Sequence, residues 1–201
     1  MPRLLIATKN AHKTSEIRAI LGDGWQVEDL TAHPEISAPE ETGETFAENA
    51  AIKAVASSKI FPGFVLADDS GLEVDALGGE PGVQSARYSG PGATDASNRA
   101  RLLRELSGAD SSARFRCVMV LAADGSALGT FAGAVEGRII NQERGTGGFG
   151  YDSLFIPNGY DQTFGELAPE IKNGLSHRAR ALGVARDFLI KIVDGPDTRR
   201  T

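Results

Sequence analysis

Two adjacent acids, Asp68 and Asp69, follow the apolar run Phe64-Val65-Leu66-Ala67 and precede Ser70 and Gly71. The run predicts a buried strand that delivers these polar groups at its end, where Gly71 is expected to let the backbone turn sharply. Hard oxygen ligands at a strand end suit Mg²⁺, which typically binds one or two carboxylates together with substrate phosphate oxygens. An Asx turn that caps the strand explains this fragment equally well when it is taken alone.

The two carboxylates are not expected to contact one ligand together. Side chains of neighbouring strand residues point to opposite faces of a sheet, so Asp68 and Asp69 diverge while the strand stays regular. We expect one of them to face a cleft and the other to brace a loop or a neighbouring helix. Which of the two acts as a catalytic base stays open at this point.

A second polar segment, Thr8-Lys9-Asn10-Ala11-His12-Lys13, lies between an expected strand at Leu4–Ala7 and an expected helix that stops at Gly22. A helix N-terminus offers free backbone N–H groups and a partial positive charge, and Lys13 adds a full charge, so the segment could bind an anion. The glycines and the ending of a Walker A loop are missing. A plain helix cap is the more common explanation of such a segment.

A capping box at Thr45 and Glu48 predicts a helix that runs to about Lys59. Asn49 and Lys53 are four residues apart and therefore share one face of this helix. That face is either a solvated surface or a wall of the same cleft, where an amide and a cation would meet a phosphate.

The glycine-rich segment 145–152 surrounds two aromatic residues and an acid. Its glycines allow close approach of the backbone to a ligand, Phe149 could stack on a base, and Asp152 could accept a hydrogen bond from a ring N–H or a sugar hydroxyl. A structural hairpin loop is the simpler interpretation of the segment alone. Further on, Ser176 is expected to cap a helix with His177 and Arg178 in its first turn, an unfavourable place for cations that suggests an anionic or carbonyl-rich ligand.

The composition describes a chain of 201 residues with 41% hydrophobic residues and a net charge of −6, enough to bury a full core. No run of Lys and Arg is dense enough to bind long nucleic acids. The single cysteine, Cys117, lies in an apolar run and is expected to pack in the core, as in a protein of a reducing compartment. No apolar stretch approaches the ~20 residues of a membrane span, and no signal peptide is evident, so a cytoplasmic location is expected.

The expected strands differ between the first and the middle third of the chain. Strands that alternate with helices in the first third predict parallel pairing. The middle third predicts a long strand at Arg114–Ala123, a hairpin turn at Ala123–Ser126 and one or two antiparallel strands over Ala127–Ile140.

These segments together resemble the inosine triphosphate pyrophosphatase family, which hydrolyses noncanonical purine nucleoside triphosphates. The resemblance covers nearly the whole chain and rests on several motifs in the right order: Thr8-Lys9-Asn10-Ala11-His12-Lys13, Glu40-Glu41-Thr42-Gly43 with Phe46 and Glu48-Asn49-Ala50, Ala67-Asp68-Asp69-Ser70-Gly71-Leu72, Pro81-Gly82 with Ser85-Ala86-Arg87-Tyr88, Gly145-Thr146-Gly147-Gly148-Phe149-Gly150-Tyr151-Asp152, and Ser176-His177-Arg178.

The resemblance implies an α/β fold with an elongated mixed β-sheet, flanking helices and two lobes around a central nucleotide cleft. Residues 1–195 would form one domain, and residues 196–201 a flexible tail. It implies a homodimer that uses Mg²⁺ to convert ITP, dITP and XTP to the monophosphate and pyrophosphate.

The resemblance also implies roles for individual residues. Glu40 and Asp69 would hold the metal, and Asp69 would orient or deprotonate the attacking water. The phosphates would contact Thr8, Asn10, Lys13, Lys53 and Ser70. The base and sugar would contact Phe149, Gly150, Tyr151, Asp152, Lys172, His177 and Arg178.

Three other functions compete with this one. A phosphatase of the haloacid dehalogenase type also ends a strand in aspartates but needs Asp-x-Asp, whereas the acids here are adjacent. The septum-inhibitor type of nucleotide pyrophosphatase, which acts on pyrimidine or methylated nucleotides, matches the motifs less well. A nucleotide sensor without turnover is disfavoured by the complete set of acids and lysines.

Overall fold

A computed structural model describes residues 1–107 and 111–194 of the chain. The flexible tail expected at 196–201 lies outside these residues. The described chain builds one six-stranded sheet in the order β2-β1-β3-β4-β5-β6. Its strands are β1 (Arg3–Ile6), β2 (Gln26–Asp29), β3 (Phe64–Val74), β4 (Ser111–Ala123), β5 (Ser126–Ile139) and β6 (Phe155–Pro157).

The sheet is mixed, as predicted. Strand β1 pairs in parallel with β2 and β3, whereas the pairs β3–β4, β4–β5 and β5–β6 are antiparallel. The change of direction falls at β3, which therefore joins the parallel and the antiparallel part. Residues 126–139 form one continuous strand, which settles the question of one or two strands in favour of one.

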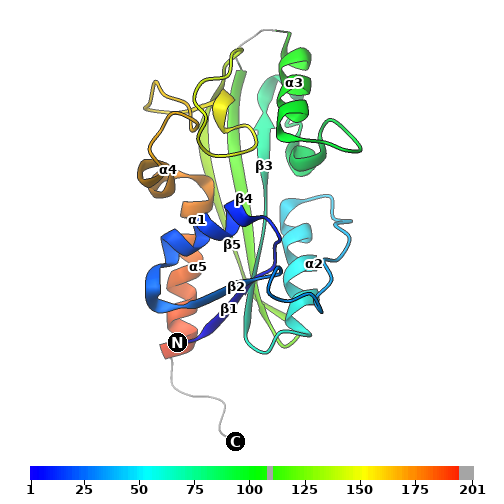
Figure 1. Cartoon of the computed structure of the whole chain (residues 1–201), viewed down its shortest axis with the longest axis vertical. Helices are drawn as coiled ribbons and strands as arrows, with labels where there is room; N and C mark the ends of the chain where they lie inside the picture. Colours follow the sequence, from blue (N-terminus) through cyan, green and yellow to red (C-terminus); the bar gives the residue numbers. More distant parts are fainter. Residues whose placement is uncertain (108–110, 195–201) are drawn as a thin grey trace, which may run out of the picture.

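Within residues 1–107 and 111–194, five α-helices flank this sheet (Figure 1). In that view α2 lies on one side of the long strands and α1, α4 and α5 lie on the other, while α3 lies above α2 at the upper end of the molecule. The helices are α1 (Ala11–Leu21), α2 (Phe46–Ser58), α3 (Asp95–Leu106), α4 (Pro169–Leu175) and α5 (His177–Asp194). None of the helices in the described part of the chain is long and apolar enough to cross a membrane.

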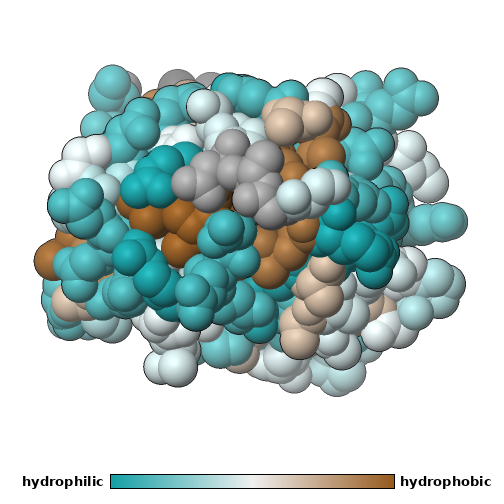
Figure 2. Space-filling view, turned by 90° about the horizontal axis from the view of Figure 1, so that it is seen from above, coloured by the Kyte–Doolittle hydropathy of each residue, from teal (hydrophilic) through white to brown (hydrophobic). Residues whose placement is uncertain are grey.

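Because the strands are pleated, neighbouring apolar side chains pack against helices on opposite faces of the sheet. Leu4 and Leu66 pack with α1 and α5, whereas their neighbours Leu5 and Val65 pack with α2. A third cluster, which includes Leu72 and residues of α3, fills the other end of the sheet. Figure 2 looks down on that end, where hydrophobic residues gather in the middle of a largely hydrophilic surface. The sheet thus runs through two lobes, one built around α1, α2 and α5 and the other around α3 and the third cluster.

The prediction that β3 ends at the two acids is wrong. The strand continues through them to Val74 because β4 pairs along its whole length, with Asp68 opposite Met119 and Asp69 opposite Val118. Gly71 makes no turn and is needed for a different reason: a Cβ there would lie 2.4 Å from the carbonyl oxygen of Gly82. The glycine thus allows another segment to approach β3 closely.

Candidate active site

A cleft of about 330 Å³ lies between the two lobes. Its lining includes the first turn of α1, α2, the middle of β3, the start of α3, the glycine-rich segment and the start of α5. The structure brings nearly all of the expected site residues into this lining: Thr8, Asn10, Lys13, Lys53, Asp69, Ser70, Phe149, Gly150, Tyr151, Asp152, Lys172, His177 and Arg178.

Glu40 is the expected site residue that the structure does not bring into the cleft. Its side chain is exposed, and its neighbour Glu41 lines the cleft instead. Glu41 Oε1 lies 3.0 Å from Lys53 Nζ. The sequence pair Glu40-Glu41 contains the right residue type, but the geometry favours the second position.

Asp69 faces α2. Its Oδ2 accepts a hydrogen bond of 3.2 Å from Asn49 Nδ2, and its Oδ1 lies 3.6 Å from Lys53 Nζ. Asp69 is 7% exposed, and this burial raises the pKa of its carboxyl even though Lys53 counteracts it. Burial also favours the neutral form of Lys53, but the surrounding carboxylates, Asp69 first among them, raise the pKa of its ammonium group.

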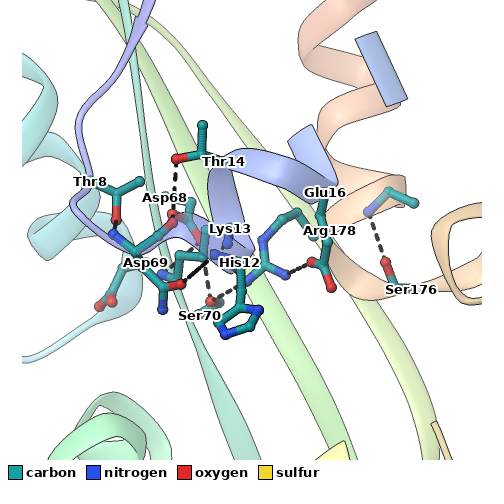
Figure 3. A network of polar contacts seen from close by, with 12 residues as sticks. Thr8, His12, Lys13, Thr14, Glu16, Asp68, Asp69, Ser70, Ser176 and Arg178 are labelled. Atoms are coloured by element: carbon teal, nitrogen blue, oxygen red, sulfur yellow. Dashed lines mark hydrogen bonds and ion pairs between the residues drawn. The ribbon is translucent and has the colours of Figure 1, made fainter. Parts of the chain in front are cut away.

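Asp68 faces the opposite side of β3, as the strand pleat requires. Its Oδ2 lies 2.9 Å from Lys13 Nζ and 3.5 Å from Arg178, and it accepts a hydrogen bond of 3.2 Å from Ser70 Oγ (Figure 3). Burial would raise the pKa of this carboxyl, but Lys13 and Arg178 outweigh it and hold the pKa far below its usual range. Asp68 is therefore a permanent anion that fixes two cations of the site.

The first turn of α1 is capped by the chain itself. Asn10 Oδ1 accepts hydrogen bonds from the backbone N–H groups of His12 and Lys13, at 3.0 and 3.3 Å. Thr8 Oγ1 in turn accepts a hydrogen bond of 3.1 Å from the Asn10 N–H. The helix-cap interpretation is thus confirmed, and two of the N–H groups expected to meet a ligand already have a partner.

Glu16, a residue of α1 that sequence reasoning missed, forms ion pairs with two cations that line the cleft. Its Oε1 lies 2.8 Å from Lys172 Nζ, and its Oε2 forms an ion pair with Arg178 (Figure 3). Lys172 also lies 2.7 Å from Asp152 Oδ2. Although burial opposes it, attraction to these carboxylates raises the pKa of Lys172. The chain itself therefore supplies the negative charge that the cations near α5 require.

His177 is not the cation expected from its place in the first turn of α5. The residue is 5% exposed, and its ring stacks on Phe115 with the centroids 4.9 Å apart. Burial, together with the charge of Arg178, lowers the pKa of this imidazole well below its usual value, so the ring is neutral near pH 7. Within the described residues its Nδ1 has no hydrogen-bond partner. A buried polar atom without a partner in the lining of a cleft is suited to a ligand.

Phe149 lines the cleft and is surrounded by three polar side chains. The ring of His12 stacks on it at a centroid distance of 5.4 Å. Lys172 Nζ and Arg178 Cζ lie 5.2 and 5.6 Å from its centroid. The backbone N–H of Phe149 donates a hydrogen bond of 2.8 Å to Asp152 Oδ2. The Asp152 carboxylate therefore orients both the loop and the Lys172 side chain.

The arrangement joins two kinds of binding surface in one cleft. On one side, cations and hydroxyl groups gather beside Asp69 and Glu41, as a polyphosphate and a metal ion would require. On the other, an aromatic ring lies beside fixed hydrogen-bond donors, as a base would require. The geometry therefore fits a nucleotide whose phosphates and base are held by different lobes.

Comparison with known proteins gives one consistent family. Residues 4–188 match the Ham1 family. The chain is 49% identical to a dITP/XTP pyrophosphatase of Bacillus licheniformis over 189 residues, which cover 90% of this chain and 95% of that protein. It is 48% identical to a dITP/XTP pyrophosphatase of Geobacter sulfurreducens over 197 residues, 94% of this chain and 97% of the relative.

Solved structures agree with this relationship. A HAM1 protein of Coxiella burnetii superposes with a TM-score of 0.85 at 38% identity and covers 95% of this chain and 100% of its own. A nucleoside-triphosphatase, dITP/XTP pyrophosphatase, of Mycobacterium abscessus gives a TM-score of 0.71 at 40% identity, with 91% and 98% covered. The sequence match and the common fold each cover most of the chain, and the chain belongs to the Ham1 family.

Proposed function

We propose that this protein hydrolyses noncanonical purine nucleoside triphosphates, namely dITP, ITP and XTP, to the monophosphate and pyrophosphate. Its relatives of nearly equal length carry the name dITP/XTP pyrophosphatase. The observation that carries the proposal is one cleft whose lining combines Lys13, Lys53 and Asp69, from α1, α2 and β3, with Phe149 and Lys172, from the glycine-rich segment and α4.

The reaction breaks the bond between the α- and β-phosphates and adds the elements of water across it. Such a step needs an aligned water and neutralised charge more than it needs a covalent intermediate. Lys13 and Lys53 provide positive charge beside the phosphates. Asp69 takes the proton of the attacking water, because it is the carboxylate of β3 that lines the cleft.

Asp69 and Glu41 would hold a Mg²⁺ ion. In the described part of the chain no group of three or more His, Cys, Asp or Glu residues could hold a metal. Two carboxylates on either side of Lys53 nevertheless fit Mg²⁺, which usually keeps several waters and shares the remaining positions with substrate phosphates. When bound, the ion supplies further positive charge against the phosphate oxygens. The earlier expectation of Glu40 as a ligand is thereby replaced with Glu41.

Base selection would rest on the donors Lys172 and Arg178 and on the free ring nitrogen of His177. Hypoxanthine and xanthine present a carbonyl acceptor at C6, where adenine presents an amino donor. Adenine would place a donor against donors and leave them unpaired, so the site would reject it. Guanine shares the carbonyl, and its rejection has to involve its 2-amino group.

The same proposal includes the protein's organisation and location. Residues 1–195 would act as one domain, because one sheet runs through both lobes. The family resemblance supports a homodimer. A single buried cysteine, Cys117, is consistent with a reducing compartment such as the cytoplasm.

A substrate panel with Mg²⁺ tests the function. We expect pyrophosphate release from ITP, dITP and XTP, little release from GTP and ATP, and none in the presence of a chelator. Orthophosphate as the product would indicate a phosphatase of the haloacid dehalogenase type. Preference for pyrimidine nucleotides would indicate the septum-inhibitor type, and ITP binding without turnover a sensor.

A further inference from the structure

Helix α3 holds both hydrogen-bonding groups of one residue in the loop that carries Phe149. The backbone N–H of Gly150 donates to Asp95 Oδ2 at 2.7 Å. The carbonyl oxygen of Gly150 accepts a hydrogen bond of 2.8 Å from Arg99 NH1. Asp95 and Arg99 are four residues apart, so they extend from the same face of the first two turns of α3.

The loop depends on such contacts because its glycine-rich backbone can adopt many conformations. Gly145, Gly148 and Gly150 all adopt positive φ angles, of 78°, 72° and 61°. A glycine-rich segment of this kind has many conformations to lose when it is ordered. Arg99 adds a second contact, since its Nε lies 3.0 Å from a carboxylate oxygen of Glu143 near the start of the loop.

The position of this loop fixes the position of Phe149 relative to the proposed base-reading cations. Gly150 follows Phe149 directly, and the Phe149 ring lies within 5.2 Å of Lys172 Nζ. Displacement of the Gly150 peptide would move the ring away from these donors. The cations at the phosphates would be unaffected, because Lys13 and Lys53 lie on α1 and α2.

We propose that Asp95 and Arg99 are positioning residues for base recognition, which fix Phe149 by binding the Gly150 peptide from α3. This inference rests on the proposed function, in which Phe149 stacks on the purine. Arg99 does not line the cleft and acts through its hydrogen bond to the Gly150 carbonyl. Asp95 lines the cleft, and the role inferred for it is the hydrogen bond from the Gly150 N–H. Their loss should therefore weaken discrimination between bases and leave binding of the phosphates intact.

Two disruptive variants and their conservative partners test the role. Asp95→Ala and Arg99→Met remove the contacts, whereas Asp95→Asn keeps an oxygen acceptor and Arg99→Lys keeps a charged donor. Arg104→Ala, which changes an exposed residue in the last turn of the same helix, is the matched control.

The first readout is catalytic. We expect Asp95→Ala and Arg99→Met to raise KM for ITP and to lower the ITP/ATP ratio of kcat/KM by roughly tenfold each, as for the loss of one hydrogen bond. Inhibition by inorganic tripolyphosphate, which has no base, should stay unchanged. Asp95→Asn should recover most of the ratio, and Arg104→Ala should match the wild type.

The second readout does not depend on activity. Amide hydrogen exchange over residues 143–152 of the ligand-free protein should be faster in Asp95→Ala and Arg99→Met than in the wild type and in Arg104→Ala. Unchanged exchange overturns the contact between α3 and the loop. Faster exchange with an unchanged ITP/ATP ratio, or with equally weakened tripolyphosphate inhibition, overturns its role in base recognition. A wild-type protein that releases no pyrophosphate overturns the proposed function instead, and exchange alone then decides on the contact.

Discussion

Asp68 and Asp69 are neighbours in the sequence but form ion pairs with lysines from different helices. Asp68 Oδ2 lies 2.9 Å from Lys13 of α1, and Asp69 Oδ1 lies 3.6 Å from Lys53 of α2. The pleat of β3 causes this separation, because adjacent side chains project to opposite faces of the sheet. Asp69 lines the cleft, whereas Asp68 lies beneath it and neutralises Lys13 and Arg178. Substitution of Asp69 should therefore affect catalysis, and substitution of Asp68 should affect stability.

Asp69→Asn should abolish turnover while the protein stays folded. The change removes the proposed base and a metal ligand together, and loss of a general base alone typically costs about 10²-fold or more. The amide oxygen can still accept the hydrogen bond from Asn49. The measurement is pyrophosphate release from ITP, with thermal unfolding as the check on folding. A folded variant that keeps more than a few per cent of the wild-type rate would remove Asp69 from catalysis.

Asp68→Asn is the matched comparison, and here the main effect should be on stability. Asp68 is 3% exposed, and its loss would leave Lys13 and Arg178 without their common counter-charge. Removal of one partner of a buried ion pair typically costs about 3 kcal/mol or more. Chemical denaturation should therefore show a lower free energy of unfolding for Asp68→Asn than for Asp69→Asn. The reverse order would contradict the assignment of the two faces.

Glu40 shows where sequence reasoning ends in this chain, because the structure leaves Glu40 exposed and lines the cleft with Glu41. Residues 34–45 contain no helix or strand, so no periodicity indicates which of two adjacent glutamates points inward. The turn expected at Gly71 was wrong for a related reason: polar residues in mid-strand resemble a strand end until the partner strand β4 is known.

Other features depended on contacts distant in the sequence. Motifs at the ends of strands and helices predicted the cleft residues, because these motifs carry their own local geometry. Glu16 could not be found in this way, since its partner Lys172 is 156 residues further along the chain. The charge of His177 was equally hidden, because burial against Phe115 decides it.

Glu41→Gln should raise the Mg²⁺ concentration needed for half-maximal activity, whereas Glu40→Gln should not. The two residues have the same chemistry and differ in position, since Glu41 lines the cleft beside Lys53 and Glu40 is exposed. Pyrophosphate release measured over a series of Mg²⁺ concentrations distinguishes the pair. A shift for Glu40→Gln alone would restore the original sequence prediction.

Arg178→Ala should lose far more activity on ITP than it gains on ATP, so that the ITP/ATP ratio of kcat/KM falls by roughly tenfold or more. Arg178 is buried between Glu16 and Asp68, and its removal also leaves these carboxylates uncompensated. Arg178→Lys is therefore needed beside it, since it keeps the charge but loses the planar pair of donors. The measurement is kcat/KM of both variants for ITP, XTP, GTP and ATP. If the folded variants keep the wild-type ratio, the base is read elsewhere.

His177→Phe should change how the stability of the protein depends on pH. The pKa of His177 in the folded chain lies well below its ordinary value of about 6.5, so below that pH the unfolded chain binds a proton that the folded chain excludes. Stability is therefore lost as the pH falls through the unfolded value, by up to about 1.4 kcal/mol per pH unit from this residue. Phenylalanine keeps a ring against Phe115 but cannot take up a proton.

Urea denaturation of both proteins between pH 5 and pH 8 measures the effect. The free energy of unfolding of His177→Phe relative to the wild type should be constant above about pH 7 and should rise steadily below about pH 6.5. The comparison cancels the other titrating groups, which both proteins share. Parallel curves over the whole range would mean that His177 gains a proton in the folded chain as readily as in the unfolded one. In that case the imidazole would be a cation in the cleft in mildly acidic solution, and its stack on Phe115 would not exclude the proton.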